Sequence, residues 1–301
     1  MRSSISSSSP DPTLTVVIGS NAPPERLVAC LDALADHRED VEVRVHEAQR
    51  CPDEVRHRFP WASFTTTPGA LVPHHWRDGI DAASGEIVAL TISQMVPADD
   101  WIATILRELD TGDVVAGAIE PGDRLRIVDW AEYFCRYARD MRPFEPRETV
   151  DLPGDNAAYR RARLESVREL YRDGFWEPEV HRRLHAEGAR LRQTPGLVVR
   201  QGRSAGFAAF TRQRWLHGRV FGRERGARFS RARNLLGVLI APLVPVVMTL
   251  RVAKLVRSKR RARGRLLSAL PAVVWFNAVW AAAEATGHVD TLRRHGPVSG
   301  P

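Results

Sequence analysis

Short β-branched runs alternate with helical patterns through the first 120 residues, and this order constrains the fold more than any other feature. Residues 14–18 (LTVVI), 41–45, 87–90 (IVAL) and 113–119 predict strands, whereas residues 24–34, 78–83 and 101–109 have helical spacing. Strands that are separated by helices form a largely parallel sheet with helices packed on its faces. The expected fold class is therefore α/β. In such sheets ligands bind beyond the carboxyl ends of the strands, here after residues 18, 45 and 90.

Charge is distributed unevenly along the chain. The 301 residues carry a net charge of +8, but residues 1–199 hold 24 Arg against 33 acidic residues. Residues 200–265 hold 18 Lys and Arg and a single acid, Glu224. The sequence therefore predicts an acidic globular part followed by a basic tail, whose partner is anionic: a membrane surface or a nucleic acid.

The basic tail is also apolar. Residues 235–250 and 266–283 are two apolar stretches, and residues 251–265 between them hold eight basic residues and no acid. Each stretch is shorter than the roughly 20 apolar residues that a helix needs to span a bilayer. We expect a pair of interfacial or re-entrant helices near anionic headgroups, because a spanning pair would place the basic loop opposite the globular domain. A spanning hairpin and two core helices of a soluble domain remain alternatives.

A nucleic-acid partner is not expected, because the chain has no zinc-finger, RRM or basic-zipper spacing. The three cysteines, Cys30, Cys51 and Cys135, form neither a disulfide framework nor a metal-binding cluster, which favours a reducing, cytosol-facing compartment. Residues 1–12 are Ser-rich without the apolar stretch of a signal peptide. We expect a disordered leader over 1–12, a globular domain over 13–230, a helical tail over 231–290 and a disordered end over 291–301.

Four segments in this order carry a family resemblance that covers residues 13 to 287. They are residues 14–21 (LTVVIGSN) with the helix pattern of 27–34, residues 79–90 (GIDAASGEIVAL), residues 154–161 (GDNAAYRR) and residues 175–188 (FWEPEVHRRLHAEG). Together they resemble the family-two glycosyltransferases of the GT-A fold, especially the membrane-associated bacterial members. The resemblance implies a Rossmann-like sandwich that binds a nucleotide sugar, followed here by a C-terminal apolar helical pair.

The resemblance also implies an activity. Such enzymes transfer a sugar, here expected to be a hexosyl unit, from a nucleotide-sugar donor with inversion to a lipid-linked or polysaccharide acceptor. The chain would then act in cell-envelope chemistry at the cytoplasmic face of the cell membrane, against anionic lipids. The alternative is a catalytically silent relative that binds a nucleotide or a partner at the membrane.

The resemblance also assigns roles to individual residues, according to their positions in the four matched segments. An inverting transfer needs a general base, usually a carboxylate. Glu177 aligns with the catalytic base of the family. Glu179 would take this role if the alignment is shifted by two residues. Asp155 is expected near the reacting centre. The expected donor-binding residues are Ser20, Asn21, Glu47, Ser93, Gln94, Asn156, Arg160 and Arg161.

One motif departs from the family. The acidic D-x-D motif, which holds Mg²⁺ or Mn²⁺, should fall on residues 92–94, where the chain reads Ile-Ser-Gln. Three explanations stay open: Asp99 or Asp100 replaces the ligands, arginines such as Arg160, Arg161 or Arg214 neutralise the diphosphate, or the site is silent. The identity of any metal ligand is therefore unknown from the sequence.

Residues 213–215 (QRW) are similar to a shortened Q-x-x-R-W element of processive members. They predict either a diphosphate contact or an interfacial helix whose arginines meet headgroups. We favour the interfacial helix. His181 and His185 lie four residues apart on a predicted helix but lack the H-E-x-x-H pattern of a zinc site.

Overall fold

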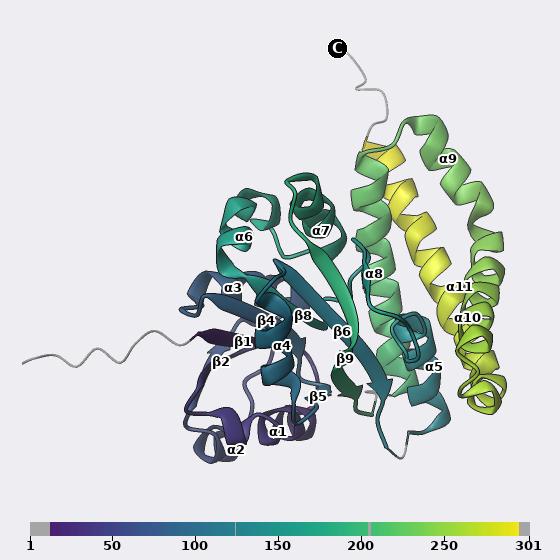
Figure 1. Cartoon of the computed structure of the whole chain (residues 1–301). Coiled ribbons are helices and arrows are strands. Elements are labelled where there is room, and N and C mark those ends of the chain that lie inside the picture. The colour runs from purple at the N-terminus through teal and green to yellow at the C-terminus, as the bar shows by residue number, and fades with distance from the viewer. Residues whose placement is uncertain (1–12, 124, 204–205, 295–301) are drawn as a thin grey trace, which may run out of the picture. The chain divides into compact units, whose positions relative to one another are not determined.

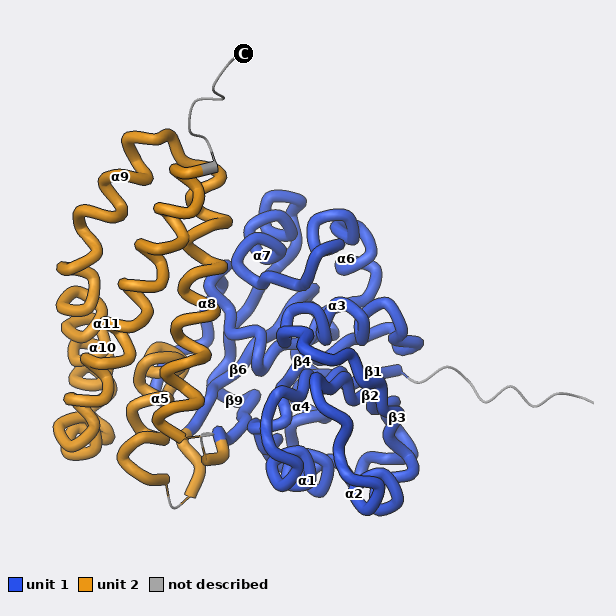
Figure 2. Tube along the Cα trace, turned by 180° about the vertical axis from the view of Figure 1, so that it is seen from behind, with its two compact units in different colours: residues 1–120, 142–201 blue, residues 121–141, 202–301 orange. Residues whose placement is uncertain are grey.

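The computed structural model describes residues 13–123, 125–203 and 206–294. The expected leader, 1–12, and most of the expected disordered end lie outside these residues. The chain divides into two compact units (Figure 2), of which unit 1 holds residues 1–120 and 142–201, and unit 2 holds residues 121–141 and 202–301. Each unit is described by itself.

Unit 1 begins with the predicted alternation of strands and helices. Its first elements are β1 (Leu14–Ser20), α1 (Pro24–Asp32), the 3₁₀ helix η1 (Ala35–His37), β2 (Val41–Glu47), α2 (Asp53–Arg58), β3 (Ala62–Thr66), α3 (Val72–Ala82) and β4 (Ile87–Ile92). All residues of β1 and β4 are buried, because these strands lie inside the sheet with helices on both faces. Helix α1 starts at a proline, whose fixed φ suits the first helical position.

The second half of unit 1 is less regular. It contains β5 (Met95–Pro97), α4 (Trp101–Leu109), β6 (Val114–Pro121), β7 (Arg147–Glu148), β8 (Asn156–Arg160), α6 (Arg161–Ser166), the 3₁₀ helix η2 (Arg168–Tyr171), α7 (Glu177–Ala186) and β9 (Leu191–Gln201). Helix α4 has the predicted bounds. Helix α2 and strand β3 were not predicted, because both are short and only partly apolar.

The strands form one mixed sheet in the order β3-β2-β1-β4-β8-β6-β9-β5, with β7 beside β9 (Figure 1). Strands β3, β2, β1 and β4 are parallel. Strand β8 runs antiparallel to β4, with Asn156 opposite Thr91 and Arg160 opposite Ile87. The chain steps outward from β1 to β3 and then returns to β4 on the other side of β1. This reversal is the place where open α/β sheets bind ligands.

Unit 2 is helical. It contains α5 (Ile127–Tyr137), α8 (Phe207–Ala227), α9 (Arg231–Ile240), the 3₁₀ helix η3 (Ala241–Leu243), α10 (Val244–Lys259) and α11 (Arg263–Arg294). The prolines of the first apolar stretch lie in the first turns of η3 and α10, where a missing N–H costs little. Residues 231–259 and 263–293 form two helical stretches that are long and apolar enough to cross a membrane.

Helix α8 packs closely on α11 through Gly218, Gly222 and Gly226. A Cβ atom on Gly222 would lie 2.2 Å from the carbonyl oxygen of Glu284, and one on Gly287 of α11 would lie 2.5 Å from the carbonyl oxygen of Arg219. Glycine is therefore required on both sides of this contact. The boundary that we expected at residue 230 differs from the structure, because α8 and α5 both belong with the tail helices. Helix α11 also continues past residue 290.

Candidate functional site

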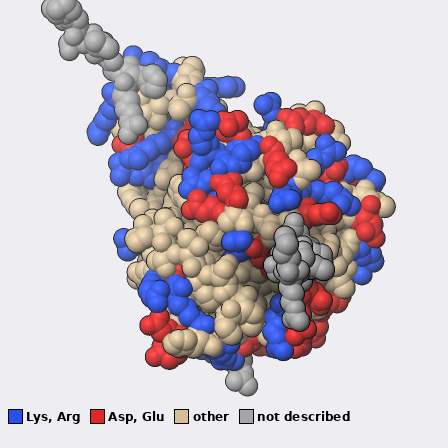
Figure 3. Space-filling model, turned by 90° about the vertical axis from the view of Figure 1, so that its left-hand side faces the viewer, with Lys and Arg blue, Asp and Glu red and all other residues tan. Residues whose placement is uncertain are grey.

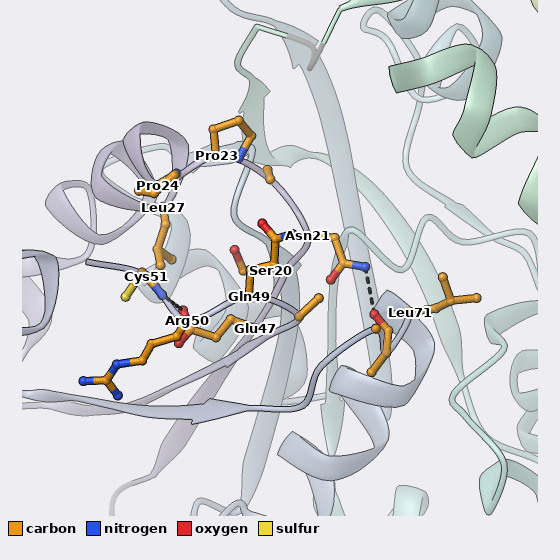
Figure 4. A pocket seen from close by; sticks show the side chains of 14 residues that line it. Ser20, Asn21, Pro23, Pro24, Leu27, Glu47, Gln49, Arg50, Cys51 and Leu71 are labelled. Atoms are coloured by element: carbon orange, nitrogen blue, oxygen red, sulfur yellow. Dashed lines mark hydrogen bonds between the residues drawn. The ribbon is translucent and has the colours of Figure 1, made fainter. Parts of the chain in front are cut away.

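A cavity of about 480 Å³ opens at the carboxyl ends of β1 and β2 (Figure 4). Three segments line it: residues 20–24 with Leu27, residues 47–51, and residues 69–71 before α3. Two of them follow the strand ends where the sequence predicted a ligand. The predicted residues Ser20, Asn21 and Glu47 all line this cavity, whereas Ser93 and Gln94 are not among its lining residues.

Glu47 is the buried carboxylate of the cavity. It is 1% exposed, and its Oε1 accepts hydrogen bonds from Arg56 and from the Thr66 hydroxyl, the latter at 2.8 Å. Its Oε2 accepts the backbone N–H of Cys51 at 3.1 Å. The ion pair with Arg56 compensates the burial of the charge. The Cys51 side chain also hydrogen-bonds Glu47, so this carboxylate is fixed in the cavity wall by three neighbouring residues.

Asn21 connects two walls of the cavity. Its Nδ2 donates to the carbonyl oxygen of Ala70 at 3.0 Å, and its Oδ1 lies 2.9 Å from Nε2 of His75 on α3. Because this amide oxygen only accepts, His75 carries its proton on Nε2. The other nitrogen, Nδ1, is buried and has no hydrogen-bond partner in the described structure. Burial, together with the smaller effect of neighbouring His46, lowers the pKa of His75 to about 4. His75 therefore holds Asn21 in place as a neutral donor.

Glu177 lies at the first position of α7, and its side chain covers Gly154. A Cβ atom on Gly154 would lie 2.4 Å from Oε1 of Glu177, so only glycine leaves room for this carboxylate. The backbone N–H of Phe175 donates to the carbonyl oxygen of Pro73 at 2.8 Å. This bond ties the Glu177 segment to the start of α3, next to the cavity residue Leu71. Glu179 lies in the same first turn, partly exposed.

Asp155 is buried at the same edge of the sheet. The Thr91 hydroxyl donates to the carbonyl oxygen of Asp155 at 3.0 Å, near the carboxyl end of β4. Behind these residues, the Tyr159 hydroxyl lies 2.8 Å from Nε2 of His181, and the two rings stack. Burial raises the pKa of Tyr159 well above its ordinary value, and the charge of Glu177 raises it further. Tyr159 therefore stays protonated in the field of the Glu177 carboxylate.

Ser93 and Gln94 occupy the turn where the sequence resemblance predicts an acidic motif. Ser93 is buried and its N–H donates to the carbonyl oxygen of Gly19 at 3.1 Å. Gln94 accepts from Nη1 of Arg26, on the first turn of α1, at 3.5 Å. Within the described residues, no three His, Cys, Asp or Glu side chains gather as a metal site. Because Mg²⁺ and Mn²⁺ prefer carboxylate oxygens, the donor set of residues 92–94 does not fit either metal.

Three predicted donor-binding residues lie elsewhere. Asn156 is fully buried, and its amide bonds the carbonyl oxygens of Ala118 and Leu197 and the indole of Trp101, which leaves no donor for a ligand. Arg160 and Arg161 stand at the opposite edge of the sheet, because β8 runs antiparallel to β4. Arg160 donates to the carbonyl oxygens of Leu109 and Gly112, and Arg161 to that of Ala83. Both arginines cap helix ends, and we withdraw them from the phosphate site.

Residues 213–215 lie on α8 in unit 2. Arg214 is buried, stacks on the Trp280 ring at 4.2 Å and donates to the carbonyl oxygen of Phe276 at 3.4 Å. Burial lowers its pKa to about 10. Arg214 is thus a core residue of the helical unit and not a headgroup contact, whereas Trp215 is exposed and Gln213 partly so.

The sequence did not identify Arg26, Arg50 and His75 as site residues. Arg50 lines the cavity, and Arg26 reaches the turn at Gln94. Arg50 could have been found from its place three residues after Glu47 in the loop that follows β2. Arg26 and His75 face the site from helices, and their direction depends on how α1 and α3 pack on the sheet.

Comparison with known proteins gives little further information. No protein-family model matches the chain, and no curated protein matches it. Among solved structures it is similar to the mannosyltransferase PcManGT from Pyrobaculum calidifontis, in complex with GDP-Man and Mn²⁺. The sequence identity is 17% and the TM-score is 0.49, over 96% of this chain and 77% of that chain. A likeness at this level carries no conclusion about function.

Proposed function

We propose that the chain transfers a glycosyl unit, expected to be a hexosyl unit, from a nucleotide-sugar donor to an acceptor hydroxyl. The observation that carries this proposal is the cavity at the carboxyl ends of β1 and β2, with the buried carboxylate of Glu47 in its wall. The ordered family-like segments at residues 14–21, 79–90 and 154–188 support it, because they supply β1, β4 and the Glu177 segment that surround one edge of the sheet.

The cavity would hold the nucleoside. Glu47 lines the cavity, and a carboxylate there suits a ribose hydroxyl or a base N–H. Ser20 lies next to Glu47 on the neighbouring strand, and the hydrogen bonds of Asn21 to Ala70 and His75 hold this part of the wall in place before the donor arrives. Such preorganisation lowers the free-energy cost of binding.

The transfer step would use Glu177 as the general base. The carboxylate takes the proton of the acceptor hydroxyl while the hydroxyl oxygen forms a bond to the anomeric carbon. The bond from that carbon to the diphosphate oxygen breaks, and the nucleoside diphosphate leaves with the bonding electrons. Attack opposite the leaving group inverts the anomeric carbon. Glu179 is the second candidate for the base, and Asp155 would lie beside the reacting centre.

The leaving diphosphate needs positive charge. In this chain Arg26 stands at the turn where the family carries its acidic motif, and Arg50 lines the cavity. We propose that these two guanidinium groups bind the diphosphate, since arginine forks bind phosphate oxygens bidentately. The acceptor would be lipid-linked or polymeric, at the cytoplasmic face of the cell membrane, which is consistent with the basic and apolar helices of unit 2.

A second candidate function is a silent relative that binds a nucleotide without turnover. The observation that favours it is the turn at residues 92–94, which holds Ser93 and Gln94 and no carboxylate. The two candidates share the cavity and differ in whether the bound donor is turned over.

Binding of UDP, GDP and their sugar conjugates to the purified chain, with and without Mn²⁺, tests the proposal. We expect saturable binding of one nucleotide, with a similar affinity in both conditions. Hydrolysis or transfer from the bound sugar nucleotide then separates the enzyme from the silent relative. A folded chain that binds none of these ligands would contradict both candidates.

A further inference from the structure

Helices α9 and α10 expose a continuous apolar stripe, hereafter the α9–α10 stripe. Its members are large aliphatic side chains between 44% and 67% exposed: Leu235, Leu236, Leu239, Ile240, Leu243, Val246, Val247 and Leu250. They recur every three or four residues, so they lie along one side of α9, η3 and α10. An exposed apolar surface of this extent marks a contact with another molecule or with a membrane.

The opposite side of the same helices is attached to α11. Asn234 is buried, donates to the carbonyl oxygen of Gly226 at 3.0 Å and pairs with Nδ1 of His288 at 2.8 Å. Asn277 of α11 donates to the Thr249 hydroxyl at 3.1 Å, and Val256 of α10 is fully buried. The helices are therefore anchored on one side, and the stripe faces outward.

The charges around the stripe have one sign. Residues 225–283 contain no acid, and their basic residues gather before and after the stripe: Arg225, Arg228, Arg231, Arg233, Arg251, Lys254, Arg257, Lys259, Arg260, Arg261, Arg263 and Arg265. Elsewhere, as on the face in Figure 3, acidic and basic side chains are interspersed. An apolar stripe with basic ends matches acyl chains beneath anionic headgroups. Self-association through this segment would instead bring like charges together.

The packing of α11 opposes a spanning arrangement. The α8 residues Arg219 and Arg223 donate to Asp290 of α11 at 2.9 and 2.8 Å, and Arg225 donates to Glu284 at 3.1 Å. These ion pairs lie just beyond the apolar stretch 266–283, but Arg214 of α8 packs on Trp280 within it. If that stretch crossed a bilayer, α8 would carry arginine side chains into the hydrocarbon beside it, which is costly. The uninterrupted apolar run 235–250 is about 24 Å long as a helix, shorter than roughly 30 Å of hydrocarbon. Only the longer stretch 231–259, which includes the basic residues at both ends, has the length to span.

We propose that the α9–α10 stripe lies flat in one leaflet of an anionic bilayer, and that no helix of unit 2 crosses the membrane. The basic segment 251–265 and unit 1 then stay on the same side. The occupant of the stripe is the lipid surface, and this inference does not require that the chain be an active transferase.

Vesicle binding by the full chain tests whether the basic residues next to the stripe bind anionic headgroups. We expect binding at least about ten-fold stronger to phosphatidylcholine vesicles that contain phosphatidylglycerol than to phosphatidylcholine alone. The triple variant Arg251→Gln, Lys254→Gln, Arg257→Gln should lose this preference. The matched control Arg38→Gln, Arg172→Gln, Arg182→Gln, with exposed arginines of unit 1, should keep it. Equal binding of the wild-type chain to both vesicles, or binding to neither, would overturn the proposal.

A second variant tests the stripe. Leu236→Gln, Leu239→Gln, Leu243→Gln should abolish vesicle binding, whereas Ile127→Gln, an exposed position on α5, should not. Circular dichroism and nucleotide binding of the variants show that the chain still folds. If the triple variant converts a dimer into a monomer and the wild-type chain binds no vesicles, the occupant is a second copy and the proposal is wrong.

Cysteine labelling separates the flat from the spanning arrangement. With Ser258→Cys in sealed proteoliposomes, an impermeant thiol reagent should label position 258 from the same side as Arg172→Cys in unit 1. Labelling from opposite sides would overturn the flat arrangement. A chain that binds vesicles but no nucleotide would contradict the proposed function and leave this inference standing, so the two can fail separately.

Discussion

At the scale of single residues, the site depends on side chains whose partners are fixed by the fold. Glu47 is held by Arg56, Thr66 and the N–H of Cys51, and Asn21 is held by Ala70 and His75. These contacts fix the position of both side chains in the cavity wall. The residues that act on the diphosphate and on the acceptor are proposals, and single substitutions distinguish them.

Replacement of the proposed base tests the chemistry. Glu177→Gln keeps the size of the side chain against Gly154 but removes the acceptor of the proton. We expect turnover to fall about 10²–10⁴-fold while the donor affinity stays within a factor of a few. Glu179→Gln, in the same helical turn, is the matched control and should keep most of the activity. If the two variants behave in the opposite way, Glu179 is the base.

Arg26 is the test of diphosphate binding. Arg26→Gln should weaken the binding of a nucleoside diphosphate about ten-fold, corresponding to roughly 1.4 kcal/mol, because one charge-assisted contact is lost. Nucleoside binding, which involves no phosphate, should not change. Arg38→Gln, an exposed residue shortly after α1, is the control. Titration calorimetry measures both, and an unchanged diphosphate affinity in Arg26→Gln would contradict the assignment.

His75 makes stability depend on pH. Its pKa is lowered from about 6.5 to about 4 in the folded chain, so the unfolded chain binds the proton first as the pH falls. The contribution is fully present above pH 6.5 and is lost between about pH 6.5 and pH 4, up to about 3 kcal/mol. His75→Gln retains a donor to Asn21 without a titrating ring. Denaturant unfolding at pH 7 and pH 5 should show a smaller acid loss in this variant than in the wild-type chain.

At the scale of the elements, the helix pair α8 and α11 is the most constrained contact of unit 2. The glycines on α8 recur every four residues, so they form one face along which the two backbones approach closely. Ion pairs from Arg219, Arg223 and Arg225 flank that face. The glycine spacing was visible in the sequence, but its partner helix was not, because α11 lies about 60 residues farther along the chain.

Glycine substitution tests this contact. Gly222→Ala places a Cβ atom 2.2 Å from the carbonyl oxygen of Glu284, so the helices must separate. We expect the free energy of unfolding to fall by about 1–3 kcal/mol. Gly264→Ala, where a Cβ atom meets nothing within 4 Å, should instead be neutral or stabilise the chain by up to about 1 kcal/mol. Thermal unfolding of both variants gives the comparison, and equal effects would contradict close packing of α8 on α11.

At the scale of the whole molecule, the two units are interleaved along the chain. Residues 121–141 leave unit 1, contribute α5 to the helical unit and return at Arg142, whose N–H donates to Glu120 at 2.8 Å. The exit and return points of unit 1 are thus adjacent. A truncation after residue 230, at the boundary that we expected from the sequence, separates α8 from its partner α11.

A fragment design follows from this interleaving. Residues 13–201 with 121–141 replaced by a short Gly-Ser linker should fold and bind the nucleotide with an affinity within about three-fold of the full chain, since the ends of the excised segment are adjacent. The same fragment with 121–141 retained exposes the α5 face that normally packs on α11, and we expect it to aggregate. Gel filtration and nucleotide titration check both fragments. Failure of the linked fragment alone to fold would show that unit 1 needs unit 2.

The α/β class, the strands β1, β2, β4 and β6 and the edge of the sheet that holds the cavity could all be predicted from the sequence. Such features depend on local spacing: β-branched runs bury on both faces, and parallel strands align their carboxyl ends. Ser20, Asn21 and Glu47 line the cavity for this reason, since each directly follows or ends a predicted strand, and their role in donor binding stays a prediction.

Features that depend on the direction of distant elements could not be predicted. Arg160 and Arg161 follow Asn156 by only a few residues, yet the antiparallel course of β8 carries them to the far edge of the sheet. Asn156 and Arg214 carry polar groups typical of binding sites, but packing encloses both. The assignment of α5 and α8 to the tail unit likewise depends on contacts between residues about 60 to 140 positions apart. The periodicity of apolar residues shows which face of a helix or strand is buried. Which other element packs on that face depends on the stability of the whole folded chain, which local spacing does not contain.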